Sequence, residues 1–173
     1  ELQDGTSVGV GHLIEKERGF TEADKREIVD AQIAIMKNVV AVHRVLQERG
    51  QIEVITTPYY HPILPLIYDT DLARVAMPGT ALPARRFSYP DDAREQVRMV
   101  AEYYEGLFGT APRGMWPGEG SVAQEIVGTV ADAGFTWMAS DDQVLQRSLG
   151  VSSLTESQRY TMYLAGEDDS SVA

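Results

Sequence analysis

The chain has 173 residues, of which 43% are hydrophobic, and it carries a formal net charge of −11. This length suits one domain with a buried core, and the acidic balance argues against nucleic acid or an anionic membrane surface as a partner, since both need clustered Lys and Arg. No apolar run could span a membrane, no secretory signal is visible, and the absence of Cys excludes disulfides, so we expect a cytoplasmic protein.

A long amphipathic helix is expected between Thr21 and Gly50. Thr21 suits the N-cap, and the acids Glu22 and Asp24 favour the positive end of the helix dipole. Apolar residues recur at helical spacing up to Gly50, which suits the residue just beyond a helix. His43 is interpreted as a residue of the helix surface rather than a ligand. The preceding Gly-rich segment has no assigned element.

Residues 51–57 are rich in β-branched side chains and predict a strand that is buried on most of its surface. A rigid loop with three prolines and His61 follows it. Short helical turns are expected at 63–68 and 70–76, and residues 77–88 are expected to form a loop because Pro and Gly interrupt them.

The next helix is expected to start at Pro90, because proline suits the first turn and Asp91 and Asp92 favour its positive end. Gly109 ends the apolar pattern of this helix. A second strand is expected at 114–117, which leads into a turn of Pro and Gly.

The turn after the second strand presents Glu119, and Ser121 with Gln124 predicts a capping box for a helix that runs to Gly134. A third strand is expected at 135–139. Asp141 and the residues beside it then cap a short helix that ends near residue 149.

Three strands that alternate with helices are typical of right-handed βα units on a parallel sheet. Such units place His61, Glu119 and Asp141 at one edge, where the carboxyl ends of the strands lie. Three strands are too few to close a barrel, which typically takes about 250 residues with eight units. We therefore expect this chain to be a slice of a larger domain.

Two sequence blocks, residues 50–65 and 114–121, resemble the second and third motif regions of family 57 glycoside hydrolases, the group of α-amylases, amylopullulanases and glucanotransferases. Residues 135–145 resemble a segment from the amylopullulanase-like branch. The resemblance covers roughly residues 12–150. In the third region of the family the Glu is the catalytic nucleophile, which corresponds to Glu119.

The resemblance implies an α/β fold in which residues 1–173 form part of an incomplete parallel (β/α)7 barrel. It also implies retaining hydrolysis or transfer on α-glucans such as starch, glycogen or pullulan, with no cofactor and no metal. The first motif region, a His-Gln-Pro-like strand, and the fourth, which supplies the acid/base Asp, have no match in this sequence. We therefore expect a chain that carries the nucleophile without its partner and is inactive by itself.

The remaining site residues each have two interpretations. Trp116 either offers an apolar face to a sugar ring or packs in the core, and His61 either bonds substrate or orders the proline loop. Glu53 either points into the barrel, toward substrate or His61, or pairs with an Arg. Asp141 either contacts the sugar in a subsite or only caps the helix that follows it.

Two other functions remain open from the sequence. A metal-dependent polysaccharide deacetylase has a related incomplete barrel, but it needs a His/His/Asp metal set, and the three His of this chain lack a His-x-x-x-His spacing. A non-catalytic glucan-binding module would keep the fold without the reaction. The presence of Glu119 weighs against that second alternative.

Overall fold

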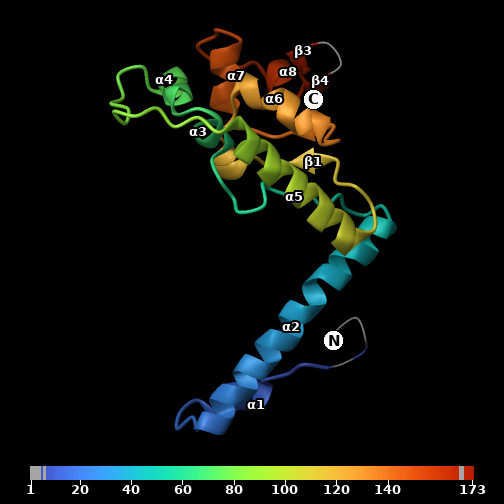
Figure 1. Ribbon diagram of the computed structural model, residues 1–173. Coiled ribbons are helices and arrows are strands. Elements are labelled where there is room, and N and C mark those ends of the chain that lie inside the picture. The colour runs from blue at the N-terminus through green and yellow to red at the C-terminus, as the bar shows by residue number, and fades with distance from the viewer. Residues whose placement is uncertain (1–4, 6, 168–169) are drawn as a thin grey trace. The chain divides into compact units, whose positions relative to one another are not determined.

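The protein is seen in a computed structural model that describes residues 5, 7–167 and 170–173 (Figure 1). The chain divides into two compact units, Glu1–Val54 and Ile55–Ala173, and each unit is considered by itself. Within the described residues, no helix combines the length and the apolar character that crossing a membrane requires.

The first unit consists mainly of helix α1 (Gly11–Lys16) and the long helix α2 (Glu22–Glu48). Thr21 caps α2 in a capping box with Asp24, which confirms the predicted start of this helix. Lys16 lies 2.5 Å from the Asp24 carboxylate. The hydrogen bond from Lys16, reinforced by those from Thr21, lowers the pKa of Asp24 to about 2.

The strand predicted over residues 51–57 is largely absent, and this expectation was wrong. Only Thr56 forms a β-bridge, and Ile52 and Ile55 are each 38% exposed rather than buried. The N–H of Val54 donates to the side-chain oxygen of Gln47, at 2.8 Å. A backbone donor used in this way is lost to a strand ladder, which explains why regular pairing is confined to the end of the segment.

Helix α5 (Pro90–Phe108) is the longest element of the second unit and has the predicted bounds. Pro90 occupies its first turn, and Gly109 ends it with a left-handed φ of 74°. The shorter helical segments of this unit are α3 (Leu64–Tyr68), η1 (Thr70–Leu72), α4 (Ala73–Ala76), η2 (Gly118–Gly120), α6 (Gln124–Asp132), α7 (Asp142–Ser148) and α8 (Glu156–Arg159).

Thr56, β1 and β2 form a small parallel sheet in which the neighbours follow the order of the chain. Strand β1 (Gly114–Met115) pairs in parallel with β2 (Trp137–Met138), and Thr56 forms a parallel bridge to Met115 on the other side of β1. The N–H of Ala173 donates to the carbonyl of Thr136, at 3.0 Å, and its own carbonyl accepts from Met138, at 2.9 Å. Ala173 therefore extends this sheet beyond β2.

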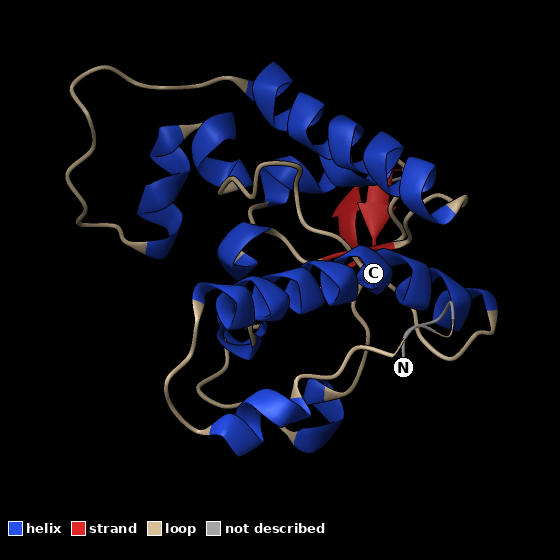
Figure 2. Ribbon diagram, turned by 90° about the horizontal axis from the view of Figure 1, so that it is seen from below, coloured by secondary structure: helices blue, strands red, loops and turns tan. Residues whose placement is uncertain are grey.

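A second, antiparallel pair joins β3 (Ala165–Glu167) and β4 (Ser170–Val172), which no sequence pattern had indicated. Both strands contact α6. Figure 2 shows the strands gathered together, while helices make up most of the regular structure.

The core of the second unit lies between the parallel strands and the helices α3, α5 and α6. Met115 of β1 is completely buried, and it shares the core with apolar residues of the three helices and of β4. Gly114 is required next to it, because a Cβ at this position would lie 2.2 Å from the ring of Trp137. The central members are Leu64, Val97, Met115, Ile126, Val130 and Val172.

The predicted capping box of α6 is also wrong. Ser121 keeps an extended backbone and ends the η2 turn, where its N–H donates to the carbonyl of Gly118, at 3.1 Å. Helix α6 begins at Gln124 after the N-cap Ala123, and no side chain caps it. The tight η2 turn thus delays the N-cap of the helix by two residues, from Ser121 to Ala123.

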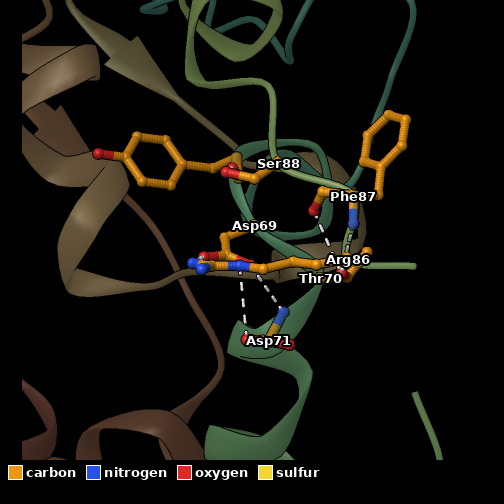
Figure 3. A network of polar contacts seen from close by, with 7 residues as sticks. Asp69, Thr70, Asp71, Arg86, Phe87 and Ser88 are labelled. Atoms are coloured by element: carbon orange, nitrogen blue, oxygen red, sulfur yellow. Dashed lines mark hydrogen bonds and ion pairs between the residues drawn. The ribbon is translucent and has the colours of Figure 1, made fainter. Parts of the chain in front are cut away.

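A polar clip closes the segment between α3 and α5 (Figure 3). The guanidinium of Arg86 binds the carboxylate of Asp69 through two nitrogens and also reaches Asp71, at 3.4 Å. Beside this ion pair the N–H of Thr70 donates to the carbonyl of Phe87, at 2.9 Å. The hydrogen bond from Arg86, followed by that from the Asp71 N–H, lowers the pKa of Asp69 to about 2.

Candidate active site

Glu119 lies at the centre of the η2 turn that directly follows strand β1. Its backbone is left-handed, with a φ of 57°, and Gly120 after it also has a positive φ, of 64°. A non-glycine residue in this region is costly and often marks a functional site. The side chain of Glu119 is 70% exposed, so the turn presents its carboxylate outward rather than to the core.

His61 lies in a second turn that α5 holds in place. Its φ is 55°, and its N–H donates to the carbonyl of Pro58, at 2.7 Å. Gln96 of α5 anchors the two residues before it: its backbone carbonyl accepts from the N–H of Tyr59, at 3.3 Å, and its side-chain oxygen accepts from the N–H of Tyr60, at 3.0 Å.

The structure brings these two turns together although 58 residues separate them. The Nε2 of His61 lies 3.0 Å from the Oε1 of Glu119. The backbone of the turns also interlocks, since a Cβ on Gly118 would lie 2.2 Å from the carbonyl oxygen of Pro62. Two residues with left-handed backbones therefore meet, one in the turn after the Thr56 bridge and one in the turn after strand β1.

The turn after β2 joins the same edge through its first residue, Ser140. The hydroxyl of Ser140 donates to the carbonyl of Gly120, at 3.0 Å. Asp141 caps α7, where its carboxylate accepts from the N–H of Gln143, at 2.8 Å. Asp142 forms an ion pair with Arg159, at 3.3 Å. Both carboxylates thus have structural partners of their own.

Trp116 and Glu53 complete the set of residues expected at the site. Trp116 follows β1 and is 41% exposed, which is more than a core aromatic would show. Its ring lies beside Gly120, at 3.4 Å from the position of a Cβ built there. Glu53 is exposed and belongs to the first unit, so it is considered apart from this cluster. Both ring nitrogens of His61 are bonded within the second unit, to Thr57 and to Glu119.

The arrangement offers an exposed carboxylate that is oriented by an imidazole, on a turn whose flanking glycines leave room for a close approach. Such a group can act as a nucleophile toward an electrophilic carbon. In the part of the chain that the structure describes, no three side chains of His, Cys, Asp or Glu gather as a metal site would require.

Three further residues shape the cluster through contacts that the sequence does not reveal: Thr57, Gly118 and Ser140. Each acts through a partner that is distant in the chain or set by the local turn, as with Ser140 and the carbonyl of Gly120. The glycine-rich run around Glu119 indicates a tight turn, but only the fold shows which backbone approaches it.

Comparison with known proteins agrees with the motif blocks. The model of glycosyl hydrolase family 57 matches residues 14–169. Alpha-amylase 1 from Dictyoglomus thermophilum is 29% identical over 99 residues, which cover 57% of this chain and 11% of that protein. The chain therefore spans only a small part of the length of this curated relative. No solved structure matches the chain.

Proposed function

Because this chain belongs to glycosyl hydrolase family 57, we propose that it supplies the nucleophile, Glu119, to a retaining glycoside hydrolase or glucanotransferase that acts on α-glucans. The observation that carries the proposal is the exposed carboxylate of Glu119 on a strained turn at the end of β1, fixed by His61. The similarity to an alpha-amylase supports an α-glucan as the substrate class.

In this proposal, one oxygen of Glu119 attacks the anomeric carbon of the sugar. The new carboxylate–carbon bond forms as the glycosidic bond breaks, and the electron pair of that bond goes to the leaving oxygen, which takes a proton from an acid/base carboxyl. Water, or a second sugar hydroxyl in the case of transfer, then attacks the same carbon and releases Glu119 while the acid/base group recovers its proton.

The acid/base group must lie about 5–5.5 Å from the nucleophile in a retaining enzyme. Asp141 caps helix α7, and Asp142 forms an ion pair with Arg159. The fourth motif region of the family has no match in this sequence. We therefore place the acid/base carboxyl outside this chain, in a longer protein, and expect the isolated chain to release no reducing sugar from amylose or pullulan.

The fold proposed for that longer protein is an incomplete parallel (β/α)7 barrel. The parallel order of Thr56, β1, β2 and Ala173 supports this proposal, because sequential parallel strands are what a barrel of βα units requires. Trp116 and Asp141 are proposed to contact the sugar at the same edge, and Glu53 keeps its sequence-based proposal as a substrate-binding residue.

The decisive experiment traps the glycosyl-enzyme intermediate with a fluorinated glycosyl donor in the longer protein, followed by peptide mapping. We expect the label on the peptide that contains Glu119. A label on any other residue overturns the assignment. Glucan binding without any label supports a non-catalytic binding module instead, and stoichiometric zinc binding with Glu119 dispensable supports the deacetylase alternative.

A further inference from the structure

A third side chain stands behind the pair of His61 and Glu119. The hydroxyl oxygen of Thr57 lies 3.1 Å from the Nδ1 of His61, while the Nε2 of the same ring lies 3.0 Å from Glu119. Thr57 directly follows Thr56, the residue that bridges to β1, so the sheet fixes the position of its backbone. The three side chains form a chain of hydrogen bonds from the strand end to the carboxylate.

The chemistry of these groups determines where the protons lie. Exposed glutamates are ionised at neutral pH, and an ionised carboxylate can only accept hydrogen bonds. The Nε2 of His61 must therefore carry the hydrogen that faces Glu119. In a neutral imidazole the Nδ1 is then an acceptor, and the hydroxyl of Thr57 is the donor to it.

We propose that Thr57 is a positioning residue that holds neutral His61 in its Nε2–H tautomer, aimed at the Oε1 of Glu119. This inference rests on the proposed role of Glu119 as the nucleophile. An orienting partner on the far side of a catalytic or metal-binding His commonly fixes which ring nitrogen carries the proton.

The consequence for the reaction concerns the two oxygens of Glu119. His61 binds Oε1 and so leaves Oε2 as the oxygen that meets the anomeric carbon. After the attack Oε1 is the carbonyl oxygen of the glycosyl ester, and it still accepts from the Nε2–H of His61. One tautomer of His61 therefore serves both the free carboxylate and the ester.

The backbone of His61 provides independent evidence that the surrounding structure fixes the orientation of this side chain. Its left-handed φ of 55° is held by the bond from its N–H to Pro58 and by the anchoring of Tyr60 on Gln96. A strained backbone conformation persists only when neighbouring contacts hold it, and such conformations are typical of functional sites, where a side chain must point in one direction.

The tautomer can be read directly by nitrogen NMR of the imidazole rings in the 173-residue chain, which contains three His. The comparison uses Thr57→Val, which removes the hydroxyl at nearly constant shape, and Thr57→Ser, which keeps it. In the neutral form of the ring we expect the Nε2–H tautomer of His61 in the wild type and in Thr57→Ser. We expect a mixture of tautomers in Thr57→Val. His12 and His43 are internal references that should not change.

The kinetic comparison uses the same variants in the longer protein proposed above. We expect Thr57→Val to lower kcat about tenfold with little change in KM, in line with the loss of an orienting partner behind a functional His, and Thr57→Ser to restore it. An Nδ1–H form of His61 in the wild type overturns the inference, as does an unchanged tautomer in Thr57→Val. A trapped label on a residue other than Glu119 overturns the proposed function. In that case the tautomer measurement still tests the role of Thr57 by itself.

Discussion

Gly118 and Pro62 lie so close together that a Cβ on Gly118 would stand 2.2 Å from the carbonyl oxygen of Pro62. This contact locks the Glu119 turn against the His61 turn and leaves no room for any side chain. The relationship explains why glycine is needed before Glu119, quite apart from the conformation of the turn.

Gly118→Ala should therefore destabilise the protein by about 1–3 kcal/mol, the usual cost of forcing an extra methyl group into a packed site. Chemical denaturation measures this change. Gly106→Ala is the matched control, because a Cβ at this position in α5 meets nothing within 4 Å. We expect that control to stabilise by up to about 1 kcal/mol through helix propensity. If Gly118→Ala and Gly106→Ala have the same stability, Gly118 does not lie in close contact with the carbonyl oxygen of Pro62.

Glu119→Gln should reduce glycosyl transfer in the longer protein by at least about a thousandfold, because the amide cannot form the covalent intermediate. Its backbone and its contact with His61 should remain. Glu125→Gln removes the same charge in the first turn of α6 and should keep the wild-type rate. Initial rates on a soluble α-glucan give the comparison, and near-normal turnover by Glu119→Gln would remove this residue from the mechanism.

Asp141 allows its capping role to be separated from a role in sugar binding. Asp141→Ala should cost about 0.5–2 kcal/mol of stability, while Asp141→Asn should be nearly neutral because asparagine is an equally good N-cap. If the proposed subsite role holds, Asp141→Asn keeps the thermal midpoint but raises KM. A wild-type KM in this variant leaves capping as the role of Asp141.

The clip of Asp69 and Arg86 should open in acid. Its carboxylate has a pKa of about 2 in the folded protein, below the value of about 3.9 in an unfolded chain. The unfolded state thus binds more protons between these values, so the stabilisation is full above about pH 4 and is lost as the pH falls toward 2.

Amide exchange at Thr70 and Tyr89, corrected for the intrinsic rates, measures this opening, since both N–H groups are bonded across the clip region. In Asp69→Asn we expect fast exchange already at pH 5 and little further change in acid. Asp71→Asn removes only the ion pair of 3.4 Å and should keep the acid transition. If the acid transition is still seen in Asp69→Asn, it arises from the protonation of a group other than Asp69.

The parts of the fold that follow from local chemistry were predictable from the sequence. Thr21, Pro90 and Gly109 mark the ends of α2 and α5 through capping and backbone preferences that act within one turn. The order of the parallel strands likewise predicts that His61 and Glu119 share an edge, and the structure places them in contact.

The rest depends on partners that a linear pattern does not reveal. The ion pair of Asp69 and Arg86 joins two residues that lie 17 positions apart in the sequence. The failed capping box shows a different limit: Ser121 has the right residue type, but the η2 turn uses its N–H before a helix can form. Thr57 is one of many β-branched residues in its segment until the position of His61 is known.

The clip also makes the segment between its two ends a suitable place for inserted sequence. The hydrogen bond between Thr70 and Phe87 already holds the two ends of this loop together. Lengthening the loop therefore adds little closure entropy, because each doubling of its length costs only about 0.6 kcal/mol. Peptides or reporter tags inserted between Met77 and Arg85, where the residues are mostly exposed, should therefore leave the turns of His61 and Glu119 intact.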